Sequence, residues 1–184
     1  DENKNIEEDF FKVIATIPLR DFNFNNKDFA IEKIYPRIQR MLAEAKQEIF
    51  IVNPFFDEEG ANKITPTLVA AARQGINIKL IVREANTSKK MQNSLKILKN
   101  ALNNEKLLNK IEIREYFKKD ENGQIYATHA KILLVDDHTC YFGSANITIP
   151  SFYYNFEVGC VFTGGEVHKL SLILAQLWVC SERI

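Results

Sequence analysis

One stretch of the chain, residues 129–146, constrains the fold more than any other, and it reads HAKILLVDDHTCYFGSAN. Two apolar runs flank the polar cluster DDH, and such a cluster between apolar runs is typical of a tight turn. If the chain reverses near residue 137, the two runs pair as an antiparallel hairpin. Residues equidistant from the turn then face each other, which predicts that Lys131 pairs with Gly143.

This hairpin would gather four polar groups of different chemistry at one end. Because side chains alternate along a strand, His129 and Lys131 point to the same face. Ser144 and Asn146 share a face of the second run, and the register places them beside His129. A lysine supplies charge, a hydroxyl and an amide donate hydrogen bonds, and a histidine is a nucleophile or general acid near neutral pH. Together these groups suit an anionic phosphodiester.

The histidine and lysine have two other possible interpretations. A metal site is the first, but a protonated lysine stands where a second ligand would be needed. The second is that His129 and Lys131 are merely the outward residues of a half-buried strand. An isolated HxK pattern is common by chance, whereas its extension through Asp136 and Gly143-Ser144-x-Asn146 is not. The extended pattern therefore favours a catalytic site.

The spacing His129-x-Lys131-x4-Asp136-x6-Gly143-Ser144-x-Asn146 resembles the HKD signature of the phospholipase D superfamily. A glutamate eleven residues after the asparagine looks like the downstream glutamate of that family. The resemblance implies no cofactor and no metal. It implies a catalytic set composed of His129, Lys131, Asp136, Ser144, Asn146 and Glu157.

The number of motifs shapes the mechanism that the resemblance implies. In this family, one HKD histidine attacks phosphorus to form a phosphohistidine. A second histidine protonates the leaving oxygen and then activates water to hydrolyse the intermediate. The sequence contains a single HKD motif and no internal repeat. We therefore expect a homodimer in which His129 is nucleophile in one subunit and general acid/base in the other.

The remaining motif residues receive their expected roles from the same resemblance. Lys131 and Asn146 of both subunits would hold phosphate oxygens, and Ser144 would assist. Glu157 would accept a hydrogen bond from an imidazole and fix its tautomer. The register turns Asp136 to the face opposite the histidine, so we expect it to have a structural role.

The substrate is less constrained than the chemistry. Single-HKD members of the family mostly act on nucleic acids, which favours a metal-independent nuclease. One alternative is a phospholipase D or phosphatidyl transferase that acts on lipid phosphodiesters. Another is a non-catalytic nucleic-acid-binding module of a larger defence or restriction assembly.

Candidates for substrate contacts are basic side chains on a predicted helix and an aromatic run that directly follows GSAN. They are Lys89, Lys90, Phe152, Tyr153 and Tyr154. The lysines, with Lys96 and Lys99 farther along, either contact phosphates or form a solvated helix face. The aromatic rings either stack on unpaired bases, enter lipid, or pack in the core.

Predicted strands alternate with predicted helices along the chain. Strands are expected over residues 48–52, 77–82, 111–117 and 157–162; helices are expected from Asp28 to 45, from Thr65-Pro66 to Gly75, over 88–108 and over 166–180. Residues 10–17 read as a strand or short helix. This alternation predicts an α/β layered domain with a central mixed, largely parallel β-sheet flanked by helices, as the phospholipase D resemblance also implies.

Composition sets the outer limits. A chain of 184 residues, 46% hydrophobic and 26% charged, is typical of one globular domain, so residues 1–184 are expected to form a single domain with residues 1–27 as an amino-terminal extension. The net charge of zero excludes overall basicity as a sign of nucleic acid. Three cysteines without CxxC spacing favour the reduced thiols of a cytoplasmic protein. No apolar run reaches the length of about 18 residues that a transmembrane helix requires.

Overall fold

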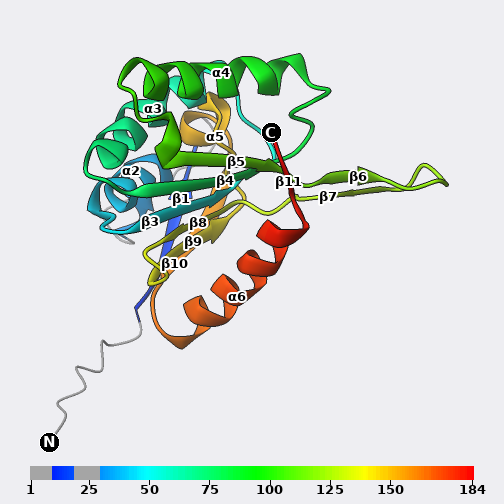
Figure 1. Ribbon diagram of the computed structural model, residues 1–184. Helices are drawn as coiled ribbons and strands as arrows, with labels where there is room; N and C mark the ends of the chain where they lie inside the picture. Colours follow the sequence, from blue (N-terminus) through cyan, green and yellow to red (C-terminus); the bar gives the residue numbers. More distant parts are fainter. Residues whose placement is uncertain (1–9, 19–29) are drawn as a thin grey trace, which may run out of the picture.

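The computed structural model describes residues 10–18 and 30–184, and within them nine strands form one mixed sheet with helices on both faces (Figure 1). The strand order is β11-β5-β4-β3-β8-β9-β10-β1-β2. The strands are β1 (Phe11–Thr16), β2 (Glu32–Lys33), β3 (Glu48–Val52), β4 (Asn77–Val82), β5 (Ile111–Glu115), β8 (Ile132–Val135), β9 (Thr139–Gly143), β10 (Glu157–Phe162) and β11 (Glu182–Arg183). The helices are α2 (Ile34–Glu44), α3 (Glu58–Arg73), α4 (Lys89–Asn104), α5 (Ile149–Tyr153) and α6 (Gly165–Cys180).

The sheet has a parallel part and an antiparallel part. Strands β3, β4 and β5 run parallel, because α3 and α4 carry the chain back between them. Strand β8 is antiparallel to β3, and β9, β10 and β1 continue that antiparallel pairing. The expected mixed α/β sheet is confirmed, but the expectation that it is largely parallel is wrong. The β8–β9 hairpin places two antiparallel strands in the middle of the sheet, and such strands need no crossover helix between them.

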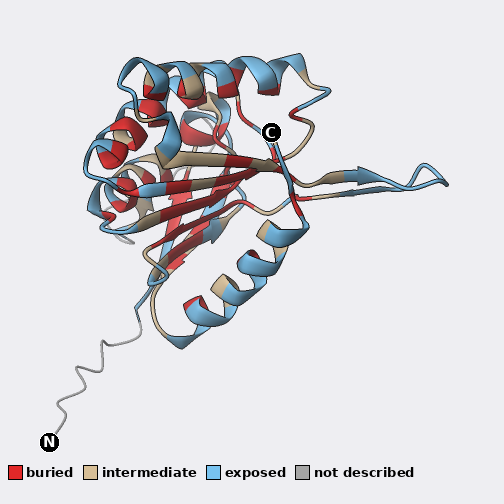
Figure 2. Cartoon of the chain, viewed as in Figure 1, coloured by how far each residue is buried: buried red, intermediate tan, exposed pale blue. Residues whose placement is uncertain are grey.

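The central strands are buried on both faces, as Figure 2 shows. Along β3, Ile49 and Ile51 face the larger core, which α2, α3 and α4 cover. Phe50 and Val52 face the smaller core, which α6 covers. Burial on both faces explains why the strand reads as a continuous apolar run instead of an alternating one.

Helix α6 contacts the sheet through a narrow stripe. Val167 and Leu174 are buried, whereas Leu172, Ile173 and Val179 are each more than half exposed. The helix is apolar on nearly every side, so periodicity alone does not identify its inner face. Its exposed side is visible in Figure 2.

The start of α3 differs from the expectation. The helix begins at Glu58, where the Asp57 carboxylate accepts a hydrogen bond from the Gly60 N–H at 2.5 Å. The pair Thr65-Pro66, predicted to begin this helix, lies inside it. Asp57 supplies the N-cap, and burial of Ala61 and Ile64 before Pro66 outweighs the hydrogen bond that proline removes. Helix α2 begins at Ile34; Asp28, its expected cap, lies outside the described residues.

Two further segments differ from what the sequence predicts. A separate ribbon, β6 (Phe117–Lys119) and β7 (Ile125–Ala127), projects from the body just before His129 (Figure 1). The β8–β9 hairpin therefore begins at Ile132. Strand β1 pairs with β10 inside the sheet, so part of the expected amino-terminal extension is integral to the fold.

The hairpin turn is held by Asp136. Asp136 and Asp137 have φ values of 55° and 57°, and the His138 N–H closes the turn on the Val135 carbonyl at 3.0 Å. The Asp136 carboxylate accepts hydrogen bonds from the backbone N–H groups of residues 46, 47 and 48 at 2.8, 2.7 and 2.9 Å. Burial alone would raise the pKa of Asp136, but these donors and the Lys46 charge together lower it. Asp136 thus fastens the turn to the start of β3.

Replacing this carboxylate isolates its contribution. Asp136→Asn is expected to lower the stability at pH 7 by about 2 kcal/mol, or roughly 4–8 °C in Tm for a chain of this size. The lowered pKa means that the carboxylate stabilises the fold above its unfolded-state pKa of about 4, and that this stabilisation is lost as pH falls through the lower folded-state value. The difference from the parent protein should therefore shrink in thermal melts below about pH 4. Asp137→Asn, at the exposed neighbouring position, is the control, and an equal loss there would contradict the role of Asp136.

Candidate functional site

The candidate site lies at one edge of the sheet, where several strand ends meet. Strand β3 ends next to Asn53 and β4 ends next to Arg83. Because β8 and β10 run opposite to the strands beside them, they begin at this same edge, next to Lys131 and at Glu157. The topology therefore gathers residues from distant parts of the sequence.

His129 and Lys131 are in direct contact. The Lys131 Nζ lies 3.1 Å from the His129 Nδ1 and 2.8 Å from the His129 carbonyl oxygen. The Gly143 N–H donates to the Lys131 carbonyl at 3.2 Å, which confirms the predicted pairing of these two residues. The Nζ also lies 3.4 Å from the His129 Nε2, and because an ammonium has only donors, the ring nitrogen that accepts from it is whichever one the tautomer leaves unprotonated. An unprotonated ring nitrogen is the form that a nucleophile needs.

Lys131 is an unusual lysine because only 7% of it is exposed. Burial is the main cause that lowers its pKa. The carboxylate of Glu157 opposes this shift, and the positive charge of Arg83 adds to it. Three charged side chains at the ends of β4, β8 and β10 thus act on one another at the site, and an anion bound there would relieve the repulsion between the two cations.

Glu157 organises the neighbouring strand. It is 7% exposed, accepts a hydrogen bond from the Ser144 hydroxyl, and lies 3.4 Å from the Asn155 amide nitrogen. The Ser144 hydroxyl also accepts the Val158 N–H at 3.1 Å. Within the chain, Glu157 therefore contacts Ser144 and Asn155, whereas the expected partner was an imidazole. Ser144 is oriented by Glu157, and its proton is already donated.

Asn146 presents an amide that the fold leaves available. Its backbone N–H donates to the Ser151 hydroxyl at 3.2 Å, which fixes the main chain. Its side-chain oxygen is buried and has no hydrogen-bond partner among the described residues. Buried polar atoms are seldom left without a partner, so this amide fits a group that binds a ligand.

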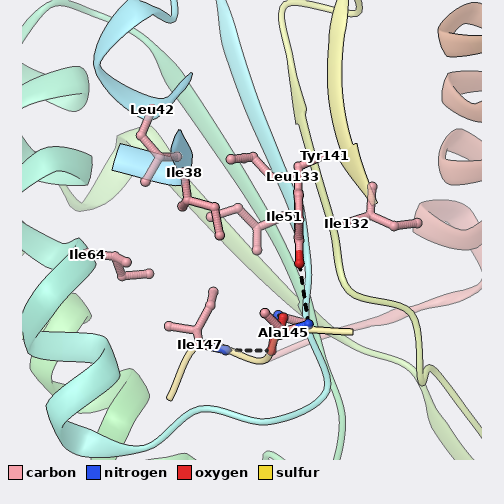
Figure 3. Close-up of a pocket in the computed structure, with 10 residues that line it drawn as sticks. Ile38, Leu42, Ile51, Ile64, Ile132, Leu133, Tyr141, Ala145 and Ile147 are labelled. Carbon is pink, nitrogen blue, oxygen red and sulfur yellow. Dashed lines mark hydrogen bonds between the residues drawn. The ribbon is translucent and has the colours of Figure 1, made fainter. Parts of the chain in front are cut away.

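Two residues that the sequence analysis did not single out hold the segment carrying Ser144 and Asn146. They are Tyr141 and Asn53, which both line a small apolar cavity of about 20 Å³, and Figure 3 shows Tyr141 beside it. The Tyr141 hydroxyl accepts the Ala145 N–H at 3.3 Å, and the Asn53 amide oxygen accepts the Ile147 N–H at 3.2 Å. Asn53 is 4% exposed, and its one sequence signal is a polar residue at the end of an apolar strand.

The glycine of the motif is required by the same tyrosine. A Cβ on Gly143 would lie 2.6 Å from the Tyr141 hydroxyl oxygen, and one on Gly159 would lie 2.4 Å from the Tyr141 ring. Gly143 and Gly159 are paired across β9 and β10. The ring thus occupies the space beside two facing glycines, and any side chain at either position would displace it.

The expected substrate contacts separate into three groups. Phe152 is 4% exposed and packs against Tyr35, with ring centroids 4.9 Å apart, so the expectation that it contacts substrate is wrong. Helix α5 turns this ring into the core and leaves Tyr153 and Tyr154 exposed, at 42% and 68%.

Lys89 and Lys90 begin α4 and are both exposed. Lys90 lines a pocket that also contains Phe55 and Arg83, and the Phe55 ring stands edge-on to the His129 ring with centroids 6.2 Å apart. Arg83 was also missed, since a single arginine after a predicted strand carries no signal in sequence.

Asp136, which belongs to the motif, lies at the other end of β8 from this edge. Val135, which pairs with Ile49, lies at the end of β8 next to the turn. Ile132, which pairs with Val52, lies at the end next to the site. The contacts of Asp136 are with the backbone before β3, as the register predicts, so the structure gives it a structural role and not a catalytic one.

Metal-binding clusters and membrane-spanning helices are both absent from the described residues. The ranges 10–18 and 30–184 contain no group of three or more His, Cys, Asp or Glu residues that could hold a metal ion. None of the helices in the described part of the chain has the length and apolarity that crossing a membrane requires.

Comparisons with known proteins agree with this geometry. The family model described as cardiolipin synthase, PLD-like domain, matches residues 38–178. The probable cardiolipin synthase YwiE of Bacillus subtilis is 31% identical over 156 residues, which are 85% of this chain and 27% of that protein. Cardiolipin synthase B of Salmonella typhi is 27% identical over 122 residues, or 66% of this chain and 26% of that protein. The chain thus spans about a quarter of the length of these relatives.

Two of the solved structures with the same fold are of similar length to this chain. The phospholipase D family member Nuc from Salmonella typhimurium superposes with a TM-score of 0.67 at 21% identity, over 96% of this chain and 99% of that chain. NucT from Helicobacter pylori superposes with a TM-score of 0.70 at 18% identity, over 95% and 100%. The matched family model, the motif and the shared fold agree, and the chain belongs to the phospholipase D superfamily.

Proposed function

We propose that this protein is a metal-independent phosphodiesterase that acts through a phosphohistidine on His129. The observation that carries the proposal is the contact of the buried Lys131 ammonium with the His129 imidazole, 3.1 Å from Nδ1. This contact places a cation that suits a phosphate oxygen directly beside an imidazole that can act as a nucleophile. Asn146 adds an amide whose oxygen has no partner among the described residues and whose N–H groups can donate to a phosphate oxygen.

The reaction follows from the positions of these groups. A ring nitrogen of His129 attacks phosphorus, and the bond from phosphorus to the leaving oxygen breaks. A second imidazole donates its proton to that oxygen, then takes a proton from water, whose hydroxide displaces His129 from phosphorus. Lys131 and Asn146 bind the non-bridging oxygens, where negative charge accumulates. Ser144, held by Glu157, positions the strand beside them.

The second imidazole is proposed to come from a second copy of the chain. Support comes from exposed apolar side chains next to the site, on three adjacent strands. Phe142, Val158 and Val13 are 52%, 42% and 49% exposed. The strand register places them on one face, and the Ser144 N–H donates to the Val158 carbonyl at 3.0 Å. Burying this face against its copy would bring two sites together.

We propose nucleic acid as the substrate. Exposed Tyr153 and Tyr154 lie on the segment after Asn146. Lys90 lines a pocket together with Phe55, and the Phe55 ring contacts the His129 ring. Rings and cations together suit an unpaired strand. Cytoplasmic location, with the cysteines reduced, belongs to the same proposal.

Lipid phosphodiesters are the second candidate. The relatives with up to 31% identity are named cardiolipin synthases, and Leu172, Ile173 and Val179 form an exposed apolar side of α6. The third candidate, a non-catalytic nucleic-acid-binding module, predicts binding without turnover. Parallel incubation with labelled single- and double-stranded DNA, RNA and phospholipid vesicles distinguishes the three.

Removal of the nucleophile tests the chemistry. His129→Ala is expected to lower turnover of the preferred substrate by at least about 10⁴-fold, because no other group of the site can form the covalent intermediate. His138→Ala, at the turn end of the same hairpin, should retain activity. A chelator should leave the parent enzyme unchanged. Activity that a chelator abolishes and a divalent ion restores would rule out this mechanism.

Charge placed on the apolar face tests the dimer. Phe142→Glu is expected to convert a dimer into a monomer in sedimentation, because a buried unpaired carboxylate costs several kcal/mol. Activity should fall with it, since each site would lack its second histidine. Leu108→Glu, at an exposed apolar position beside β5, is the matched control. A parent protein that is a fully active monomer would overturn the shared site.

Salt dependence tests the substrate class. The inactive His129→Ala protein should bind single-stranded nucleic acid with a log affinity that falls linearly with log salt, with a slope of about −0.7 per neutralised phosphate. Replacing Lys89, Lys90, Lys96 and Lys99 together by alanine should flatten this slope. No affinity for DNA or RNA at low salt, together with turnover of phospholipid, would select the lipid candidate.

A further inference from the structure

A shallow pocket of about 60 Å³ lies next to the proposed nucleophile. Phe55 and Arg83 line it from the segments after β3 and β4, and Ser88 and Lys90 line it from the start of α4. The Phe55 ring also stands edge-on to the His129 imidazole. One aromatic ring therefore separates the pocket from the reacting nitrogen.

The pocket carries more positive than negative charge. The Arg83 guanidinium lies over the Phe55 ring at 5.3 Å and donates to Glu84 at 2.6 Å. A guanidinium has five donors, and the buried Nε of Arg83 has no partner in the part of the chain that the structure describes. Lys90 makes no ion pair within those residues. Two cations thus face a single carboxylate.

The walls of the pocket are fixed before a ligand arrives. Glu84 has a φ of 55°, a conformation that side chains other than glycine adopt at some cost and that is found often at functional sites. The buried Glu115 carboxylate holds the following segment through the Ala85 N–H and the Asn86 amide. Because the loop that carries Arg83 is already ordered, binding an anion there requires little rearrangement.

The size of the pocket identifies the kind of group that fits. A volume of about 60 Å³ is roughly four to six times the 10–15 Å³ that one water molecule needs. That is comparable to the five heavy atoms of a phosphate group. Phe55, which is 39% exposed, adds an apolar surface between this position and His129.

We propose that this pocket, with Arg83 and Lys90 as its cations, binds the phosphate next to the one that His129 attacks on a nucleic acid strand. The inference rests on the proposed phosphodiesterase function and extends it to a second subsite. Neighbouring phosphates of one strand are joined through a single ribose, and the exposed Phe55 ring lies where that nucleoside would pass. A substrate with one phosphodiester leaves the pocket empty.

The test compares substrates with one and two phosphodiesters. Bis(4-nitrophenyl) phosphate has one, and the thymidine trinucleotide TpTpT has two. Lys90→Ala should raise the KM for TpTpT by about tenfold, the loss expected for one charge-assisted hydrogen bond. It should leave the KM for bis(4-nitrophenyl) phosphate unchanged. Lys106→Ala is the control, because this exposed lysine after α4 does not line the pocket. Glu84→Gln should lower the KM for TpTpT, since it removes the opposing charge.

A binding measurement makes the result independent of turnover. In the His129→Ala background, the anisotropy of fluorescein-labelled TpTpT should show weaker binding for Lys90→Ala and unchanged binding for Lys106→Ala. Equal effects of the two lysine variants on binding and on KM would overturn the subsite, while hydrolysis of bis(4-nitrophenyl) phosphate would uphold the proposed function. Binding that depends on Lys90 in a protein without any phosphodiesterase activity would uphold the subsite and overturn the proposed function.

Discussion

The register of the β8–β9 hairpin is the constraint on which the rest of the structure depends. A single register pairs Val135 with Thr139 at the turn and brings the Gly143 N–H to the Lys131 carbonyl at the site. A slip of one residue would turn every side chain of the strand to the other face. The clamp of Asp136 on the start of β3 therefore acts on the site from the opposite end of the strand, because it fixes the register that orients Lys131.

What could be predicted from the sequence is what depends on neighbouring residues. The turn at Asp136 and Asp137, the pairing of Lys131 with Gly143 and the contact of Lys131 with His129 follow from alternation along one hairpin. The fold class was also predictable, since strands and helices alternate. The direction of the strands was not, because pairing of β8 with β3 joins segments about 80 residues apart, and only packing of both sheet faces selects it.

The rest of the site was missed for the same physical reason. Asn53, Arg83 and Tyr141 reach the site from separate strands, and each is a common residue with no pattern around it. Phe152 was misassigned because an aromatic run gives no indication of which ring a short helix turns inward; its contact with Tyr35 decides this. The groups expected to touch phosphate oxygens are local in sequence, whereas the groups that surround them come from distant segments.

The Tyr141 ring between two facing glycines has a consequence for how this sequence can change. Enlarging Gly143 or Gly159 alone forces the ring aside and disturbs its hydrogen bond to the Ala145 N–H. Shrinking Tyr141 alone opens a void in a close-packed interior. The three positions therefore form one unit whose substitutions are not additive. A different arrangement here is reachable only when a smaller side chain at 141 and larger ones at its neighbours appear together, which makes this corner of the site resistant to gradual change.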